Sequence, residues 1–520
     1  MRVLIVLPFL ASIIVCEAQN KVNRLGAPIN HPSINVSSPY MSLEGNSMLF
    51  VSDNAEDNVL TVFYSAKPDG VNWKEPVPLP KTLNGRLNFL RGFGLSPDGK
   101  QVYISTTKGG GLGGYDIYVA DMKGTYWTEP QNVGQPVNSK ENEGCASIAT
   151  DGNTMYFMRC AKMDANSASG CRIMVATKKT GDMRWQPPVE LPAAINTGNS
   201  QAPRIMGDGE TLIFSSDQMG GKGGMDLFIT KKTGNTWSKP APLDFANTPG
   251  DDEYVSANSL GRYLVKDSPT KTATEIVELL FPTDLKPHAV MKIEGKVQGP
   301  ANLASPYVNM IDAKTQQRLL TTRPSKEGAF TLYLIEGNIY NVVIDPEQDN
   351  YTFFSHVFDL TTGKISTLEK LDATLKPVAA GDIINLEGVT FKPHSSEMNE
   401  SSKTELRKVA RLANGAASLK FNVEVDLYGY QKDSLKSDPD LTEVISDSVR
   451  YTITTDSTSR DSLAVRYTYH NDRTQQEALE IVNYLIEQGV PANKVMPATK
   501  VFDAIPEERK TVVRLIARPL

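Results

Sequence analysis

Short runs of alternating apolar and polar residues recur through the first half of the chain, with a period of roughly 50 to 58 residues. In each repeat an Asp-Gly or related turn precedes an apolar run, as in SPDGKQVYIST from Ser96. A second run follows, such as YDIYVA from Tyr115, and then a tryptophan with a proline three residues later. The turn residues tolerate the positive φ of a tight hairpin, and the alternation is typical of half-buried strands. Four short strands per repeat predict the blades of a β-propeller.

The repeats favour a ring of five blades, with six as the alternative. Four complete copies use all four tryptophans of the chain, Trp73, Trp127, Trp185 and Trp237. A fifth copy, with the runs SANSLGRYLVKD and TEIVELLF, lacks the Trp-x-x-Pro element. After three of the tryptophans an apolar residue and an asparagine recur five residues apart, and Leu25 with Asn30 keeps that spacing. We therefore expect the N-terminal segment to complete the last blade, because closure leaves no free sheet edge.

The repeat resembles a known family. SPDGKQVYIST, followed by GGGLGGYDIYVA, is similar to the WD40-like propeller repeat called PD40, which is common in bacterial periplasmic proteins. The resemblance implies a propeller domain over residues 19–285. Because propellers present loops on a rigid ring, a binding role is expected.

Residues 286–376 carry shorter alternating runs, which predict a small β-sandwich. The glycines and aromatic residues resemble those of carboxypeptidase-regulatory-like domains, at Gly295, Val297, Asp312, Gly328, Phe330, Gly337 and Tyr340. The resemblance implies a seven-stranded sandwich without peptidase chemistry, and we expect a spacer or adhesive module.

Residues 380–520 change to an α+β pattern. A strand from Ile384, an amphipathic helix, the strand FNVEVDLYGY, a second helix ending at Gly489 and the last strand KTVVRLIARPL follow one another. This order resembles the OmpA-like peptidoglycan-binding domain. The best match lies in the second helix, at Ala478, Ile481, Tyr484, Leu485 and Gly489.

The ligand-binding positions of that family are changed in this chain. The resemblance implies a site for the carboxylate and ammonium groups of diaminopimelate, built from a Gly-His-Thr-Asp turn and an arginine. Here the turn has Tyr430 and Lys432, with Asp433 one place late, and Glu477 stands at the arginine position. Replacing an arginine by a glutamate turns a bidentate carboxylate clamp into a repelling group.

Two interpretations of this site stay open. In the first, Asp433 enters the site with help from Arg473 or Arg509, and binding is retained. In the second, the site does not bind, and Lys432 with Glu477 forms a surface ion pair worth at most about 1 kcal/mol. The candidate ligand-binding residues are Tyr430, Asp433, Arg473, Glu477 and Arg509.

An insertion at residues 434–468, rich in Ser, Thr and Asp, interrupts the family's turn and predicts a polar loop. Asp-Ser triplets in or beside it resemble the O-glycosylation sequon of Bacteroidetes, with Ser434, Ser448, Ser457 and Ser462 as the acceptors. The alternative is chance, because a segment full of Asp and Ser produces such triplets by composition.

Residues 1–18 predict a secretory signal peptide, with one basic residue, an apolar run from Val3 to Val15, and Ala18 at the cleavage position. The apolar run is too short for a membrane span, and no later run is long enough. Cleavage is the expectation, and lipidation of Cys16 is the alternative. The mature protein is therefore expected in the periplasm or associated with the outer membrane.

Export to an oxidising compartment gives the other cysteines a structural interpretation. Cys160 and Cys171 flank the expected loop of a hairpin, so we expect a disulfide between them, with Cys145 as the remaining thiol. None of the five histidines lies near them in the sequence, so no metal site is expected.

Composition and motifs limit the classes of function. A net charge of −6 with 22% charged residues provides no basic field for nucleic acid. The sequence has no G-x-S-x-G elbow, no sialidase-type Asp box and few histidines, so neither an enzyme nor a cofactor is expected.

The order of domains also carries a resemblance. It is similar to that of the Por-E-type peptidoglycan-associated subunits of the type IX secretion system, although their N-terminal helical-repeat domain is missing here. We expect a non-enzymatic envelope scaffold with protein partners and a tether to peptidoglycan. The alternative is a glycan or small-ligand receptor that uses the propeller's central funnel.

Overall fold

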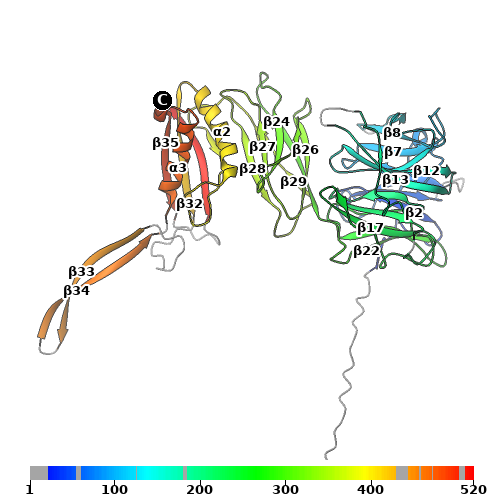
Figure 1. Ribbon diagram of the computed structural model, residues 1–520, viewed down its shortest axis with the longest axis horizontal. Helices are drawn as coiled ribbons and strands as arrows, with labels where there is room; N and C mark the ends of the chain where they lie inside the picture. Colours follow the sequence, from blue (N-terminus) through cyan, green and yellow to red (C-terminus); the bar gives the residue numbers. More distant parts are fainter. Residues whose placement is uncertain are drawn as a thin grey trace, which may run out of the picture. The chain divides into compact units, whose positions relative to one another are not determined.

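The computed structural model describes residues 22–53, 60–124, 126–179, 184–218, 220–428, 443–455, 458–470, 472–502 and 510–520. The expected signal peptide lies outside these residues. The chain divides into two compact units, Met1–Met291 and Lys292–Leu520, which are described separately (Figure 1). Within the described part of the chain, no helix has the length and apolar character needed to cross a membrane.

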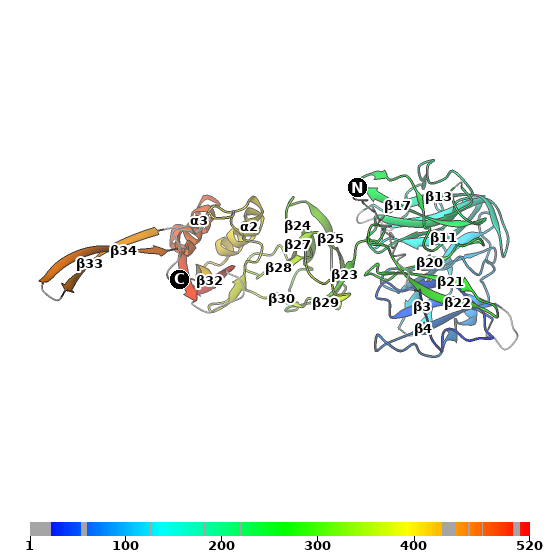
Figure 2. The ribbon, with the colours of Figure 1, turned by 90° about the horizontal axis from the view of Figure 1, so that it is seen from below.

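The first unit is a β-propeller of five antiparallel sheets (Figure 2). In spatial order the first three sheets are β2 (Val36–Met41), β3 (Ser47–Ser52), β4 (Thr61–Ala66), β5 (Val77–Pro78); β6 (Gly94–Leu95), β7 (Gln101–Thr106), β8 (Asp116–Lys123), β10 (Gln131–Asn132); and β11 (Asn142–Ile148), β12 (Thr154–Met163), β13 (Ala168–Thr177), β14 (Val189–Glu190). The other two are β15 (Gln201–Ile205), β16 (Thr211–Ser216), β17 (Asp226–Thr233), β19 (Ala241–Pro242); and β20 (Val255–Ser256), β21 (Tyr263–Pro269), β22 (Thr274–Leu280), β1 (Val22–Arg24). Strands β9 (Tyr126–Trp127) and β18 (Thr236–Trp237) pair with β8 and β17, and the short helix α1 (Lys81–Asn84) follows β5.

The N-terminal strand completes the last sheet. Strand β1 pairs antiparallel with β22, with Val22 opposite Leu279 and Arg24 opposite Val277. This pairing joins the two ends of the propeller sequence, as the spacing of Leu25 and Asn30 predicts. The ring is thereby closed without leaving β22 as a free edge.

The recurring asparagine has a structural reason that the sequence does not reveal. In each sheet the side-chain amide of one asparagine bonds both backbone groups of a residue in the third strand, as Asn138 does with the N–H (3.0 Å) and C=O (2.9 Å) of Ile117. The five pairs are Asn30 with Ile276, Asn84 with Val62, Asn138 with Ile117, Asn196 with Ile173 and Asn247 with Leu227. The asparagine amide therefore satisfies backbone N–H and C=O groups of the third strand at the point where the outer strand no longer pairs with it.

The inner strands of three sheets share a β-bulge beside the centre of the ring. Ser38, Cys145 and Ala202 have φ angles of 52°, 52° and 44°, and each lies where the register of its strand shifts. Such a bulge re-aims the side chains that follow it. In β15 the first residue back in register with β16 after the bulge is Arg204.

A disulfide joins Cys160 and Cys171, which lie directly opposite each other in β12 and β13. Cys145 is a buried free thiol, and burial raises the pKa of this thiol to about 12. It therefore stays protonated and unreactive at neutral pH.

The second unit begins with two four-stranded sheets that face each other. One contains β26 (Ala329–Ile335), β23 (Val290–Gln298), β29 (Leu368–Lys370) and β30 (Ala373–Thr374); the other contains β25 (Arg318–Thr322), β24 (Tyr307–Asp312), β27 (Ile339–Asp345) and β28 (Phe354–Asp359). The two sheets have eight strands in place of the expected seven, because β29 and β30 are two short strands that pair one after the other with β23.

The same unit continues with a mixed sheet covered on one face by two helices (Figure 1). The sheet has the order β31 (Ile383–Asn385), β36 (Lys510–Pro519), β32 (Leu419–Tyr428), β35 (Val495–Phe502), and the helices are α2 (Glu400–Gly415) and α3 (Thr474–Glu487). Helix α3 ends before Gly489, whose φ of 86° suits the expected glycine stop. Strand β35 follows the 3-10 turn η1 (Ala492–Lys494) and is absent from the sequence prediction, because VMPATKVF has weak alternation and a proline. Among the described strands its one partner is β32, with which it pairs in parallel as an edge strand that tolerates proline.

The predicted polar loop is wrong for residues 443–455 and 458–470, which form a two-stranded ribbon, β33 (Glu443–Thr455) and β34 (Thr458–His470). Its apolar residues alternate with polar ones, so each face of the ribbon carries an exposed apolar stripe. One stripe is formed by Val449, Tyr451 and Ile453, and the other by Leu463, Val465 and Tyr467. The Ser, Thr and Asp content suggested a loop, but the β-branched and aromatic residues that alternate along both strands have high β-propensity, and the two strands pair along their whole length.

A buried carboxylate on α2 contacts the neighbouring sandwich sheet. Glu405 Oε2 accepts hydrogen bonds from Ser355 Oγ at 2.7 Å and from Asn341 Nδ2 at 3.3 Å. Burial raises the pKa of Glu405 above its ordinary value. Arg411, on the same helix, pairs with Asp345 at 2.5 Å. These contacts hold the sandwich and the α+β domain together as one unit.

Candidate functional site

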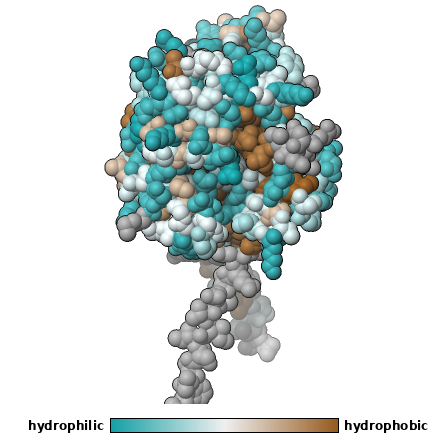
Figure 3. Space-filling view, turned by 90° about the vertical axis from the view of Figure 1, so that its right-hand side faces the viewer, coloured by the Kyte–Doolittle hydropathy of each residue, from teal (hydrophilic) through white to brown (hydrophobic). Residues whose placement is uncertain are grey.

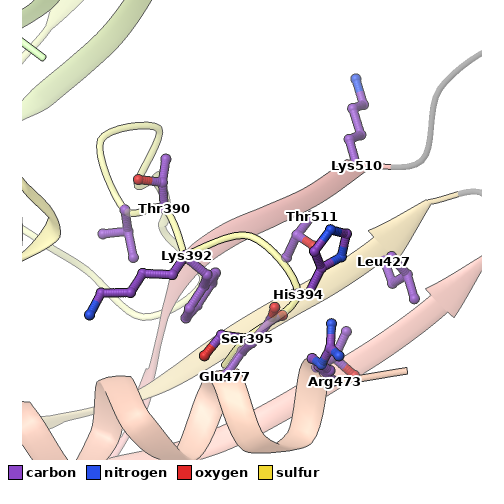
Figure 4. A pocket seen from close by; sticks show the side chains of 12 residues that line it. Thr390, Lys392, His394, Ser395, Leu427, Arg473, Glu477, Lys510 and Thr511 are labelled. Atoms are coloured by element: carbon purple, nitrogen blue, oxygen red, sulfur yellow. The ribbon is translucent and has the colours of Figure 1, made fainter. Parts of the chain in front are cut away.

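A pocket of about 320 Å³ lies in the α+β domain, between the loop before α2, the start of α3 and the adjoining ends of β32 and β36 (Figure 4). Four elements, spread over more than a hundred residues of the sequence, therefore meet at one concave surface. The described residues that line it are Val389, Thr390, Phe391, Lys392, His394, Ser395, Leu427, Arg473, Thr474, Glu477, Lys510 and Thr511.

Side chains at the beginning of α2 fix the loop that forms one wall. Ser402 Oγ, which is buried, accepts the N–H of Thr390 at 2.9 Å and donates to its carbonyl at 2.8 Å. Asn399 Nδ2 donates to Thr390 Oγ1 at 2.9 Å and to the carbonyl of Phe391 at 3.0 Å. The loop is thus held in place by the protein itself, so the wall is pre-formed for a ligand.

The opposite wall is set by the start of α3. Asp472 Oδ1 accepts the N–H of Thr474 at 2.9 Å and its hydroxyl at 2.8 Å, which satisfies a donor at the start of the helix. Arg473 and Glu477 then lie one helical turn apart. Glu477 is only 7% exposed, and Figure 4 shows its carboxylate rising from α3 toward the loop that carries His394 and Ser395.

The charges around the pocket are mixed, with cations in excess. Arg473 stands at the start of α3, Lys510 at the beginning of β36, and Lys392 in the loop, where it also pairs with Glu397. Glu477 is the one carboxylate among the described lining residues. A molecule carrying both a carboxylate and an ammonium group has partners of both signs here, with the planar guanidinium of Arg473 suited to the carboxylate.

The structure brings two predicted site residues together, Arg473 and Glu477. Tyr430, Asp433 and Arg509 lie outside the described residues, as do Lys432 and the serines Ser434 and Ser457. Glu477 is buried, and its expected ion pair with Lys432 involves a residue outside the described ranges. Of the serines expected to accept glycans, Ser448 is exposed on β33 and Ser462 is partly exposed on β34.

Sequence reasoning missed the loop residues of the pocket and Lys510. The available signal was the segment FKPHSS directly before α2, in which Lys392, His394 and Ser395 follow one another closely. His394 has a φ of 56°, an uncommon conformation for a residue other than glycine. Such conformations persist where the surroundings hold them and often mark ligand sites.

A second polar cavity, of about 310 Å³, lies at one end of the propeller. Glu253 and Asp267 line it, and burial raises the pKa of both carboxyl groups. Arg91 pairs with Glu253 at 3.6 Å, and Asp267 accepts the backbone N–H of Ser38 at 3.1 Å. No cluster of His, Cys, Asp or Glu fit to hold a metal ion occurs within the described ranges.

No family model and no curated protein matches this chain. Among solved structures, a putative TolB from Agrobacterium tumefaciens aligns with 14% identity and a TM-score of 0.29, over 59% of this chain and 91% of its own. TolB from Acinetobacter baumannii aligns with 13% identity and a TM-score of 0.27, over 59% and 68%. An oligogalacturonate lyase from Vibrio parahaemolyticus aligns with 11% identity and a TM-score of 0.30, over 52% and 96%. At these values the likeness carries no functional argument, and the propeller assignment rests on the five sheets themselves.

Proposed function

We propose that this protein is a non-enzymatic scaffold of the bacterial envelope. In this proposal the propeller presents its surface to protein partners in the periplasm, and the α+β domain tethers the chain by binding the peptide of peptidoglycan. Membership of a type IX secretion assembly, as a Por-E-type subunit, is part of the proposal. Figure 3 supports a binding role for the propeller, because the viewed face is mainly hydrophilic with apolar side chains gathered in a smaller area.

The observation that carries the tether is the pocket around Glu477. The stem peptide of peptidoglycan offers free carboxylates and, at diaminopimelate, an ammonium group beside a carboxylate. In the proposed complex Arg473 binds the carboxylate and Glu477 binds the ammonium group. The family uses one acidic and one basic side chain for these two groups. Here Glu477 supplies the acidic side chain from the family's arginine position, and Arg473 supplies the basic one. This exchange compensates for the inverted charges in the sequence.

The mature full-length chain tests this directly, in sedimentation with purified peptidoglycan. Charge-assisted contacts contribute about 1.5 to 3 kcal/mol each, so Glu477→Gln and Arg473→Gln should each weaken binding about ten-fold or more. Glu480→Gln is the matched control, because Glu480 is exposed on the same helix. Equal binding by all three variants, or no binding by the parent chain, would reject the tether.

The polar cavity with Glu253 and Asp267 favours a second candidate function, a glycan or small-ligand receptor. A cross-linked pull-down from native envelopes separates the two candidates. Recovery of secretion-system subunits supports the scaffold, whereas recovery of polysaccharide alone supports the receptor.

A further inference from the structure

Arg204 lies at the centre of the propeller and contacts three other sheets. It follows the bulge in β15 and is 3% exposed. Its Nε donates to the carbonyl of Val255 at 3.3 Å, and its Nη2 donates to the carbonyl of Phe93 at 3.1 Å. The guanidinium carbon lies 4.4 Å from the centre of the Tyr40 ring. The positive charge is therefore held in a fixed place by four of the five sheets.

None of these partners neutralises the charge. Both hydrogen-bond acceptors are backbone carbonyls, the aromatic ring is uncharged, and no group among the described residues accepts a hydrogen bond from Nη1. The acidic residues just before β20 pair elsewhere, Asp252 with Lys266 and Glu253 with Arg91. Burying a charge without a counter-charge is costly, so a bound anion at Nη1 would offset a large penalty.

A small cavity adjoins Arg204 at the end of the ring where each inner strand turns into the next strand. All five sheets contribute to its lining, and the cavity measures about 50 Å³. One water occupies about 30 Å³ of liquid, so there is room for a small ion but not for a sugar or a nucleotide. The walls combine apolar side chains, such as Leu43, Leu95 and Ile148, with hydroxyl-bearing ones, such as Ser42 and Ser256. Hydroxyl groups donate hydrogen bonds to an anion, and the apolar side chains lower the local dielectric, which strengthens its contact with the guanidinium.

We propose that this cavity binds one small monovalent anion, chloride or a carboxylate of the size of acetate, against Nη1 of Arg204. The anion supplies the counter-charge that the protein lacks at this point. Because the guanidinium joins four sheets, anion binding fixes the ring in its closed form. The inference is independent of the proposed tether, which uses the other unit of the chain.

Thermal unfolding of the mature full-length chain tests the proposal. All four tryptophans lie in the propeller, so their fluorescence reports on this unit alone. An anion that binds only the folded ring raises the Tm in a saturable manner, and about 7 °C is expected at a concentration one hundred times the Kd. Sodium chloride and sodium acetate should both produce this rise. The sodium salt of the bulky sulfonate MES, at equal ionic strength, should not.

The variants connect the effect to one side chain. Arg204→Met should lose the saturable rise, whereas Arg204→Lys, which keeps the charge, and Arg262→Met, at an exposed arginine of the same unit, should retain it. A rise of equal size in the sulfonate salt, or in Arg204→Met, would overturn the proposal. If Arg204→Met does not fold, the ³⁵Cl line width with the parent chain decides. Broadening that acetate relieves supports the site, and broadening that acetate leaves unchanged rejects it.

Discussion

Replacing Asn30 by alanine tests whether the two ends of the propeller sequence hold the ring closed. Asn30 Nδ2 donates to the carbonyl of Leu25 at 2.6 Å and to that of Ile276 at 2.8 Å, and Asn30 Oδ1 accepts the N–H of Ile276 at 2.8 Å. Ile276 is 0% exposed, so its N–H cannot find water after the substitution. Each buried group left unsatisfied costs about 1 to 3 kcal/mol, and Asn30 is itself half-buried, so we expect a loss of about 2 to 4 kcal/mol.

For a unit of this size, that loss lowers the Tm by about 5 to 12 °C. Tryptophan fluorescence during heating measures the change in the propeller without interference from the second unit. Asn23→Ala is the control, because Asn23 lies on β1, shortly before Asn30 in the sequence, and its side chain makes an exposed hydrogen bond to Glu278. A Tm for Asn30→Ala equal to that of the control would refute the reasoning that Asn30 closes the last blade.

Three further predictions concern other parts of the chain. Replacing Cys160 and Cys171 by serine should lower the free energy of unfolding by about 2 to 3 kcal/mol in denaturant titrations, and Cys145 should stay unreactive toward a thiol reagent until the chain unfolds. Burial raises the pKa of Glu405 in the folded state, so the free energy of unfolding should fall as pH rises above the pKa of this group in the unfolded chain. Glu405→Gln should remove that fall. A pH profile by calorimetry that the substitution leaves unchanged would contradict the raised pKa of Glu405. Replacing residues 443–470 by a short glycine-serine linker should leave the Tm of the second unit within about 2 °C, because the ribbon is exposed, and a larger loss would show that the ribbon packs on the domain.

Several features of the fold follow from the sequence because their causes are local. Asp-Gly turns, period-two alternation and the recurring Trp-x-x-Pro element predict the hairpins of each blade. The spacing of Leu25 and Asn30 predicts that β1 closes the ring, because one asparagine makes the same two backbone hydrogen bonds in every blade. The positions of Cys160 and Cys171 at the two sides of one hairpin are also a short-range property.

Other features depend on contacts between distant residues, so the sequence alone does not predict them. Strand β35 contains a proline and exists because β32 offers it a parallel partner, and the ribbon exists because β33 and β34 pair with each other. Glu477 appears as an inverted charge in a linear comparison, and only folding places it opposite the loop that Ser402 and Asn399 hold. In the sequence Arg204 is like any polar residue of a strand. It is buried among neutral groups only because the ring closes around it. The sequence thus determined the repeating elements through local propensity and pattern, whereas the tertiary structure decided which charges are buried and what they face, because burial and long-range contact exist only in the folded chain.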